Sequence, residues 1–122
     1  MPDRIQKLRL GGAAALLLCA FGVTPAWAQD APALIAEPAP ERRQQLVHMV
    51  RQECGACHGL ALTGGLGLPL TPTALQDKPL EFLASTIYGG RPGTAMAAWG
   101  ALLSRDEAQW IAAQLKAGFP KE

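Results

Sequence analysis

A five-residue run, Cys54-Gly55-Ala56-Cys57-His58, constrains this chain more than any other feature. It has the C-x-x-C-H form, in which two thiols attach to the vinyl groups of one porphyrin and the next histidine binds its iron. The run predicts a fold built around a large flat ligand, c-type haem. A redox-active dithiol and half of a zinc site are the alternatives. The first lacks a surrounding βαβ pattern, and the second lacks further ligands, because His48 is the only other histidine.

The first 28 residues have the pattern of a secretory signal peptide. Basic residues precede an almost wholly apolar stretch from Leu10 to Val23, and Ala26-Trp27-Ala28 is a small-x-small cleavage site. The apolar stretch is shorter than the roughly 18 to 20 residues that span a bilayer, so we expect no permanent membrane anchor. We predict export to the periplasm and cleavage after Ala28, with Cys19 discarded in the signal.

The mature chain that this cleavage predicts has 94 residues, enough for one small domain. Its eight Lys and Arg against nine Asp and Glu give no support for nucleic-acid binding or for a polybasic membrane surface. We therefore expect protein partners and a monomer. Residues 29–40, rich in Pro and Ala, are predicted to form a flexible leader, and residues 41–122 the folded domain.

Three helices are predicted, and no segment alternates as a strand does. Asp77 is the expected N-cap of the second helix, and Ser104-Arg105-Asp106-Glu107 has the form of a capping box for the third. The Gly/Pro-rich stretch after His58 suits a close loop. The sequence therefore predicts an all-α domain whose Gly/Pro loops wrap one covalent haem. The predicted helices run from Glu41 to Glu53, from Asp77 to Gly89-Gly90, and from Ser104 to Gly118.

A sixth ligand for the iron is also needed. His48 and Met49 lie on the first predicted helix, on the side of the covalent attachment, from which the other face of the ring is hard to reach. Met96 lies 38 residues beyond His58 in a Gly/Pro loop that can reach around a haem edge. We predict Met96 as the distal ligand, with a core role for this methionine as the alternative.

Polar partners are predicted for the imidazole and for the haem carboxylates. The carbonyl of Leu68 or Pro69 is expected to accept a hydrogen bond from Nδ1 of His58, unless Pro69 only shapes a turn. Candidate partners of the haem propionates are Arg91, whose alternative is a solvated loop charge, and Trp99 or Tyr88.

The order of these features resembles the class I cytochrome c family over roughly Glu41 to Phe119. The resemblance implies thioether bonds at Cys54 and Cys57, proximal ligation of the iron by His58 and distal ligation by Met96. It also implies that the first and last helices cross near one haem edge. Because the first helix has no aromatic residue on its face, we expect Trp110 to pack there against aliphatic side chains.

More narrowly, CGACHGLALTGGLGLPLTPTAL and IYGGRPGTAMAAW are similar to the small NirC-type cytochromes of nitrite respiration. This resemblance implies a periplasmic mono-haem electron carrier, not an enzyme. Its partner would be the cytochrome-type nitrite reductase, as electron acceptor or during maturation of the reductase haem. The alternative is a haem enzyme or gas-binding protein with an open sixth site, for which the sequence offers no distal acid-base residue.

Overall fold

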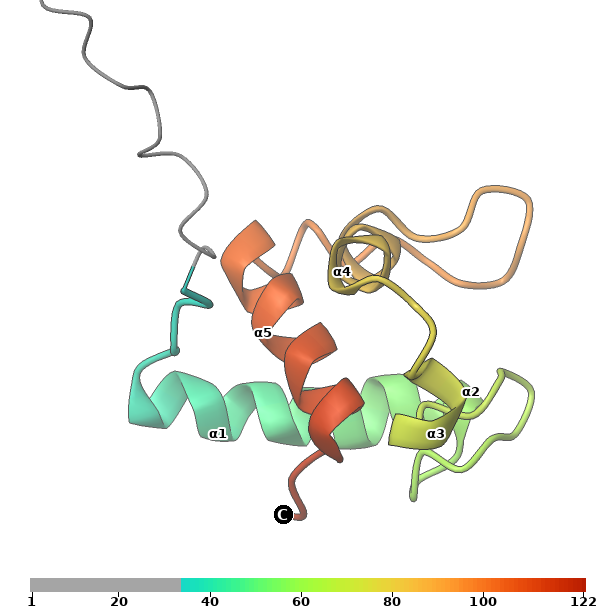
Figure 1. The fold of residues 1–122 in the computed structure, drawn as a ribbon, viewed down its shortest axis with the longest axis horizontal. Helices are drawn as coiled ribbons and strands as arrows, with labels where there is room; N and C mark the ends of the chain where they lie inside the picture. Colours follow the sequence, from blue (N-terminus) through green and yellow to red (C-terminus); the bar gives the residue numbers. More distant parts are fainter. Residues whose placement is uncertain (1–33) are drawn as a thin grey trace, which may run out of the picture. The chain divides into compact units, whose positions relative to one another are not determined.

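A computed structural model of the chain describes residues 34–122. The predicted signal peptide, residues 1–28, and the start of the leader lie outside the described residues. The described part is helical and has no strand among its residues (Figure 1), which confirms the predicted all-α class. The helices are α1 (Pro40–Met49), η1 (Val50–Cys54), α2 (Gly55–His58), α3 (Pro72–Leu75), α4 (Leu80–Gly89) and α5 (Arg105–Ala117).

One continuous helical rod, made of α1, η1 and α2, carries the C-x-x-C-H motif at its end (Figure 1). It begins at Pro40, a residue suited to a first helical turn because its missing N–H would have no partner there. η1 is a π-helical segment, whose hydrogen bonds span one residue more than those of an α-helix. The rod stops at Gly59, where φ is +84°. The predicted first helix therefore extends five residues further, through His58.

The second predicted helix starts later than expected. Pro79 is the N-cap of α4, so the prediction of Asp77 as N-cap is wrong. The physical reason is the proline, which disfavours helical backbone in the residue before it and thereby delays the helix. The Gly/Pro-rich stretch also holds a short helix that the sequence did not reveal, α3, capped by a hydrogen bond from the Ala74 N–H to the Thr71 hydroxyl at 3.3 Å.

The predicted capping box at the start of α5 is confirmed. The Glu107 N–H donates to the Ser104 hydroxyl at 3.1 Å, and the Ser104 N–H donates to the Glu107 carboxylate at 2.8 Å. The same carboxylate accepts from Nε of Arg42 at 2.6 Å, which links α1 to α5. This guanidinium is the main reason why the pKa of Glu107 lies below its ordinary value.

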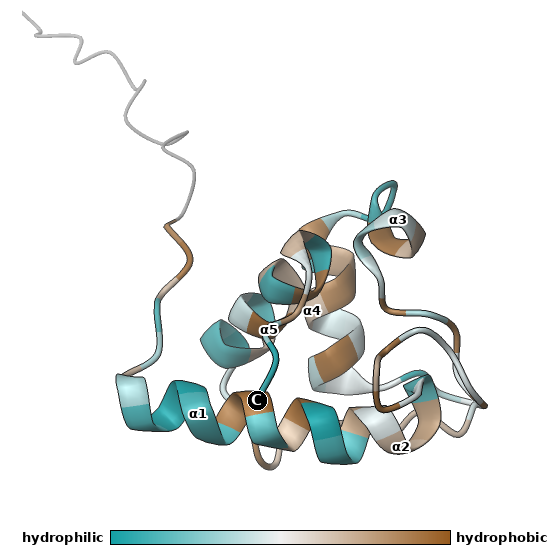
Figure 2. Ribbon diagram, turned by 90° about the horizontal axis from the view of Figure 1, so that it is seen from below, coloured by the Kyte–Doolittle hydropathy of each residue, from teal (hydrophilic) through white to brown (hydrophobic). Residues whose placement is uncertain are grey.

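A single cluster of buried apolar side chains forms the core, with Leu46, Val50 and Trp110 fully enclosed. The expected packing of Trp110 among aliphatic side chains is confirmed. Its indole N–H donates to Glu37 at 2.8 Å, which holds the end of the leader against the domain. In Figure 2, α1 is mostly hydrophilic and α4 mostly hydrophobic. None of the helices in residues 34–122 is long and apolar enough to cross a bilayer.

Candidate haem-binding site

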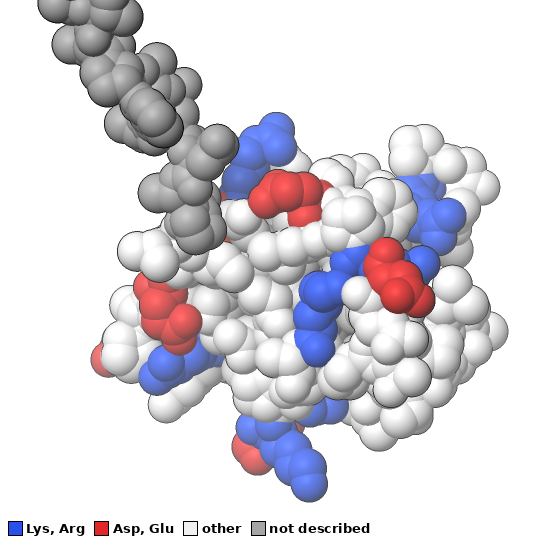
Figure 3. Space-filling view, in the orientation of Figure 1, with Lys and Arg blue, Asp and Glu red and all other residues white. Residues whose placement is uncertain are grey.

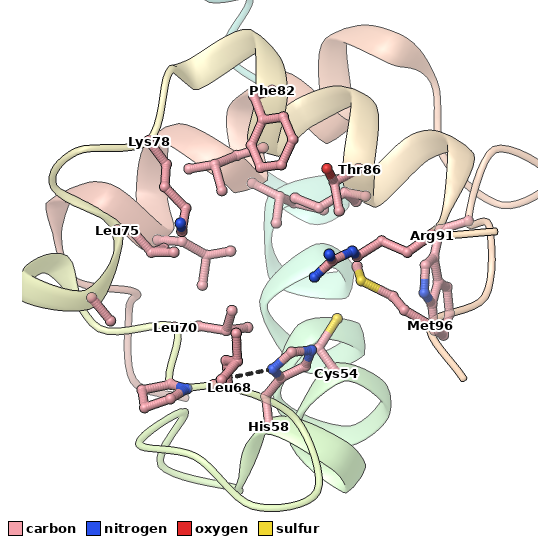
Figure 4. Close-up of a pocket in the computed structure, with 17 residues that line it drawn as sticks. Cys54, His58, Leu68, Leu70, Leu75, Lys78, Phe82, Thr86, Arg91 and Met96 are labelled. Carbon is pink, nitrogen blue, oxygen red and sulfur yellow. Dashed lines mark hydrogen bonds between the residues drawn. The ribbon is translucent and has the colours of Figure 1, made fainter. Parts of the chain in front are cut away.

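A cavity of about 320 Å³ opens beside the end of the helical rod (Figure 4). Its lining is mostly apolar and comes from the end of the rod, the loop before α3, α3 itself, the turn between α3 and α4, α4, the loop after α4 and α5. The volume lies within the roughly 300 to 1,000 Å³ that small-molecule and cofactor pockets occupy. Three of the four predicted site residues line this cavity: Cys54, His58 and Met96.

The imidazole of His58 is held by the loop that follows it. Its Nδ1 lies 2.6 Å from the carbonyl oxygen of Leu68 (dashed line in Figure 4). Because a carbonyl only accepts, Nδ1 donates in this hydrogen bond, and in the neutral ring Nε2 then keeps a lone pair for a metal ion. Of the two carbonyls that the sequence offered, Leu68 therefore makes the bond. Gly67 lies so close to the ring that a Cβ there would sit 2.7 Å from Nδ1.

The two cysteines of the motif have different surroundings. Cys54 is half-buried in the cavity wall, and burial raises the pKa of its thiol to about 11. Cys57 is exposed and is absent from the cavity lining. Both thiols are free of disulfide bonding, as a site for covalent attachment needs.

Met96 reaches the cavity from the loop between α4 and α5, with its sulfur pointing inward (Figure 4). The other candidates for a sixth ligand lie elsewhere. Met49 packs, partly buried, against the core. Nδ1 of His48 lies 2.8 Å from the carboxylate of Glu122, on the outside of the domain.

Two cations face this apolar cavity, Lys78 and Arg91 (Figure 4). No Asp or Glu is among its lining residues, and neither cation is in an ion pair within the described part of the chain. Lys78 was not identified from the sequence as a cavity residue, because a single lysine before a proline forms no recognisable binding motif. Trp99 lines the cavity, but Tyr88 does not, since its ring lies under the Arg105 guanidinium at 4.5 Å.

These residues fit a haem group. An apolar cavity accepts the ring, a thiol in the wall is placed to attach it, and the cations complement its carboxylates. A free imidazole nitrogen and a thioether are the donor types that iron takes in such centres. The arrangement favours bound haem over a dithiol centre, because a dithiol centre needs neither a large apolar cavity nor a histidine and a methionine beside the cysteine.

Comparison with known proteins also indicates a haem-binding cytochrome. The family model for cytochrome C oxidase, cbb3-type, subunit III matches residues 41–115. Cytochrome c55X of Stutzerimonas stutzeri is 49% identical over 89 residues, which is 73% of this chain and 79% of the relative. The solved structure of the c-type cytochrome NirC matches with a TM-score of 0.65 and 52% identity, covering 66% of this chain and 95% of NirC.

Dihydro-heme d1 dehydrogenase NirN, solved in complex with DHE, matches with a TM-score of 0.55 and 35% identity. The match covers 62% of this chain and 16% of NirN, so the similarity is to one part of a larger protein. The family match spans most of the described domain and includes the motif, the cavity walls and most of α5. The chain therefore belongs to the c-type cytochromes of the class I fold, electron carriers that bind haem covalently.

Proposed function

We propose that this protein is a periplasmic, monomeric carrier of single electrons in nitrite respiration. Cys54 and Cys57 would hold one haem c, and His58 and Met96 would bind its iron. The observation that carries the proposal is that Met96, from the loop after α4, meets Cys54 and His58, from the end of the helical rod, at one apolar cavity. The signal peptide, cleaved after Ala28, delivers the chain to the compartment where this type of haem is attached.

Bound haem supplies one-electron chemistry between ferric and ferrous iron. The chain supplies orientation, because the Leu68 carbonyl holds the His58 ring with Nε2 available. It also supplies the second ligand from Met96, and apolar side chains such as Leu83 and Ile111 exclude water. Because His58 and Met96 would both bind the iron, no position on it would remain for a substrate, and the protein would act as a carrier and not as an enzyme.

The proposed partners are the cytochrome-type nitrite reductase or the proteins that mature its haem, by similarity to NirC and NirN. Basic and acidic residues are interspersed on the face shown in Figure 3, without a large patch of one sign. From Cys54 to Gln76 the sequence has no Lys, Arg, Asp or Glu, and Leu60, Leu66 and Leu68 are exposed there. Such a surface suits brief docking that owes little to charge steering.

The test starts from the full chain, expressed with its signal peptide in a host that exports and matures c-type cytochromes. Intact mass should show a chain without residues 1–28 plus one haem. The reduced protein, mixed with the cytochrome-type nitrite reductase and nitrite, should be oxidised rapidly and without strong dependence on salt. A mass without haem would contradict the proposal. No oxidation by the reductase would exclude the reductase as electron acceptor and leave the proteins that mature its haem as the partners. Rapid binding of carbon monoxide by the reduced protein would instead indicate an open sixth site and a gas-binding function.

A further inference from the structure

The loop that carries Met96 is closed by its own hydrogen bonds. The Arg91 N–H donates to the Met96 carbonyl at 3.1 Å, so residues 91–96 form a small ring at the end of α4. Gly90, with φ at +69°, packs directly on this ring, and a Cβ there would lie 2.9 Å from the Met96 carbonyl oxygen. The chain after Met96 returns to α4 through a hydrogen bond from the Trp99 N–H to the Ile87 carbonyl at 3.2 Å.

Thr94 bridges the two ends of this ring. Its hydroxyl donates to the Arg91 carbonyl at 2.8 Å and accepts from the Met96 N–H at 3.3 Å. Its own N–H donates to the same Arg91 carbonyl at 3.0 Å. The Thr94 side chain is exposed, so these hydrogen bonds, not burial, are what its hydroxyl contributes to the loop. Its branched Cβ restricts χ1 and thereby keeps the hydroxyl in the bridging position.

Such a bridge matters because methionine is a flexible ligand. Its side chain has three rotatable bonds, so the position of the sulfur depends on how firmly the backbone of Met96 is held. Met96 itself is only half-buried, and its neighbours Thr94, Ala95, Ala97 and Ala98 are exposed. The loop therefore receives little support from packing, and its hydrogen bonds are what hold the backbone of Met96 in position.

We propose that Thr94 is a positioning residue for the sixth ligand. Its hydroxyl fixes the backbone of Met96 and thereby sets how readily another ligand displaces the Met96 sulfur from the iron. This inference rests on the proposed function, in which Met96 binds haem iron. A competing ligand binds only the fraction of molecules whose methionine is released, so a looser loop raises its apparent affinity.

Imidazole titrated into the ferric haem protein is the probe. Thr94→Val removes the hydroxyl and keeps the branched shape, and Thr94→Ala removes the hydroxyl without the branch. Both should bind imidazole about two- to tenfold more tightly than the wild type, the range that corresponds to one net hydrogen bond. The charge-transfer band of methionine-ligated ferric haem should weaken in parallel. Thr94→Ser, which restores the hydroxyl, and Thr73→Val, at an exposed position on α3, should match the wild type.

Met96→Ala separates the two proposals. If it raises imidazole affinity and abolishes the band while both hydroxyl-free variants behave as wild type, the carrier proposal stands and the role of Thr94 is overturned. If Met96→Ala changes neither property, Met96 is not the ligand and both ideas fail. A lower unfolding midpoint for Thr94→Val with unchanged imidazole affinity would show a purely structural role, and it too would overturn the inference.

Discussion

His58 and Met96 reach the same cavity from walls that are built differently. The His58 wall is made of backbone folded tightly onto the motif, with the Gly67 N–H donating to the Cys57 carbonyl at 2.7 Å and Leu68 holding the ring. The Met96 wall is an exposed loop held by its own hydrogen bonds. In the proposed site, the ligand next to the cysteines is therefore placed by local sequence, whereas the second ligand depends on a loop held mainly by its own hydrogen bonds.

The largest expected effect comes from removing the imidazole of His58 from the His58 wall. His58→Ala should lower the haem content of the purified protein by roughly tenfold or more, because attachment and proximal ligation both centre on this residue. Haem absorbance per protein and intact mass are the measurements. Cys54→Ala and Cys57→Ala are the matched variants, and each should retain at most one thioether bond. Two intact thioethers in either cysteine variant would refute the assignment of the motif.

Removal of Met96, the proposed second ligand, should leave the haem attached but free one coordination position of the iron. Met96→Ala should bind imidazole more tightly by on the order of tenfold or more, because no side chain then competes. Its reduction potential should fall, since methionine ligation raises it. Spectroscopic titration and potentiometry measure the two effects. Met49→Ala should change neither, because Met49 packs against the core. Equal behaviour of the two variants would remove the distinction between the walls.

A smaller effect should follow from crowding the His58 wall. Gly67→Ala places a methyl group 2.7 Å from the imidazole ring, so the loop or the ring must shift, at a cost of about 1–3 kcal/mol in unfolding free energy. Gly89→Ala is the control, since a Cβ there meets nothing within 4 Å and alanine favours the helix by about 0.5–1 kcal/mol. Denaturant unfolding separates them. Equal stability of the two variants would show that the contact on His58 is not tight.

The smallest effect is expected from a substitution that lies in neither the His58 wall nor the Met96 wall. Glu107→Gln weakens the link to Arg42 and should cost about 0.5–1 kcal/mol at neutral pH, because the Arg42 side chain is about one third exposed. Arg42 lowers the pKa of Glu107, so this stabilisation is present above the ordinary carboxyl pKa of 4.5 and is lost as the pH falls through the lowered value. Unfolding at neutral and acidic pH checks this, with Glu41→Gln as control. A shift in imidazole affinity would show instead that α5 and the Met96 wall are coupled.

Most of the features that the sequence predicted are local. The attachment motif, the start of α5 and the Leu68 carbonyl each depend on residues close together in the chain. The features that it missed depend on tertiary contacts or on weak local signals. α3 is only four residues long and lies in a Gly/Pro-rich stretch, so it is too short to show the repeat of apolar residues by which a helix is predicted. Lys78 acquires its position only because the chain folds it over the cavity.

The π-helical segment η1 lets one helix serve two purposes. Leu46 and Val50 face the core, and Cys54 and His58, at the next two four-residue steps, face the cavity. In an α-helix each such step advances by about 40° around the axis, so the series would spiral away from one side. The wider turn of η1 rotates less per residue and offsets that drift between Val50 and Cys54. The segment therefore sets the phase between a stripe that holds the fold together and a stripe that receives the cofactor.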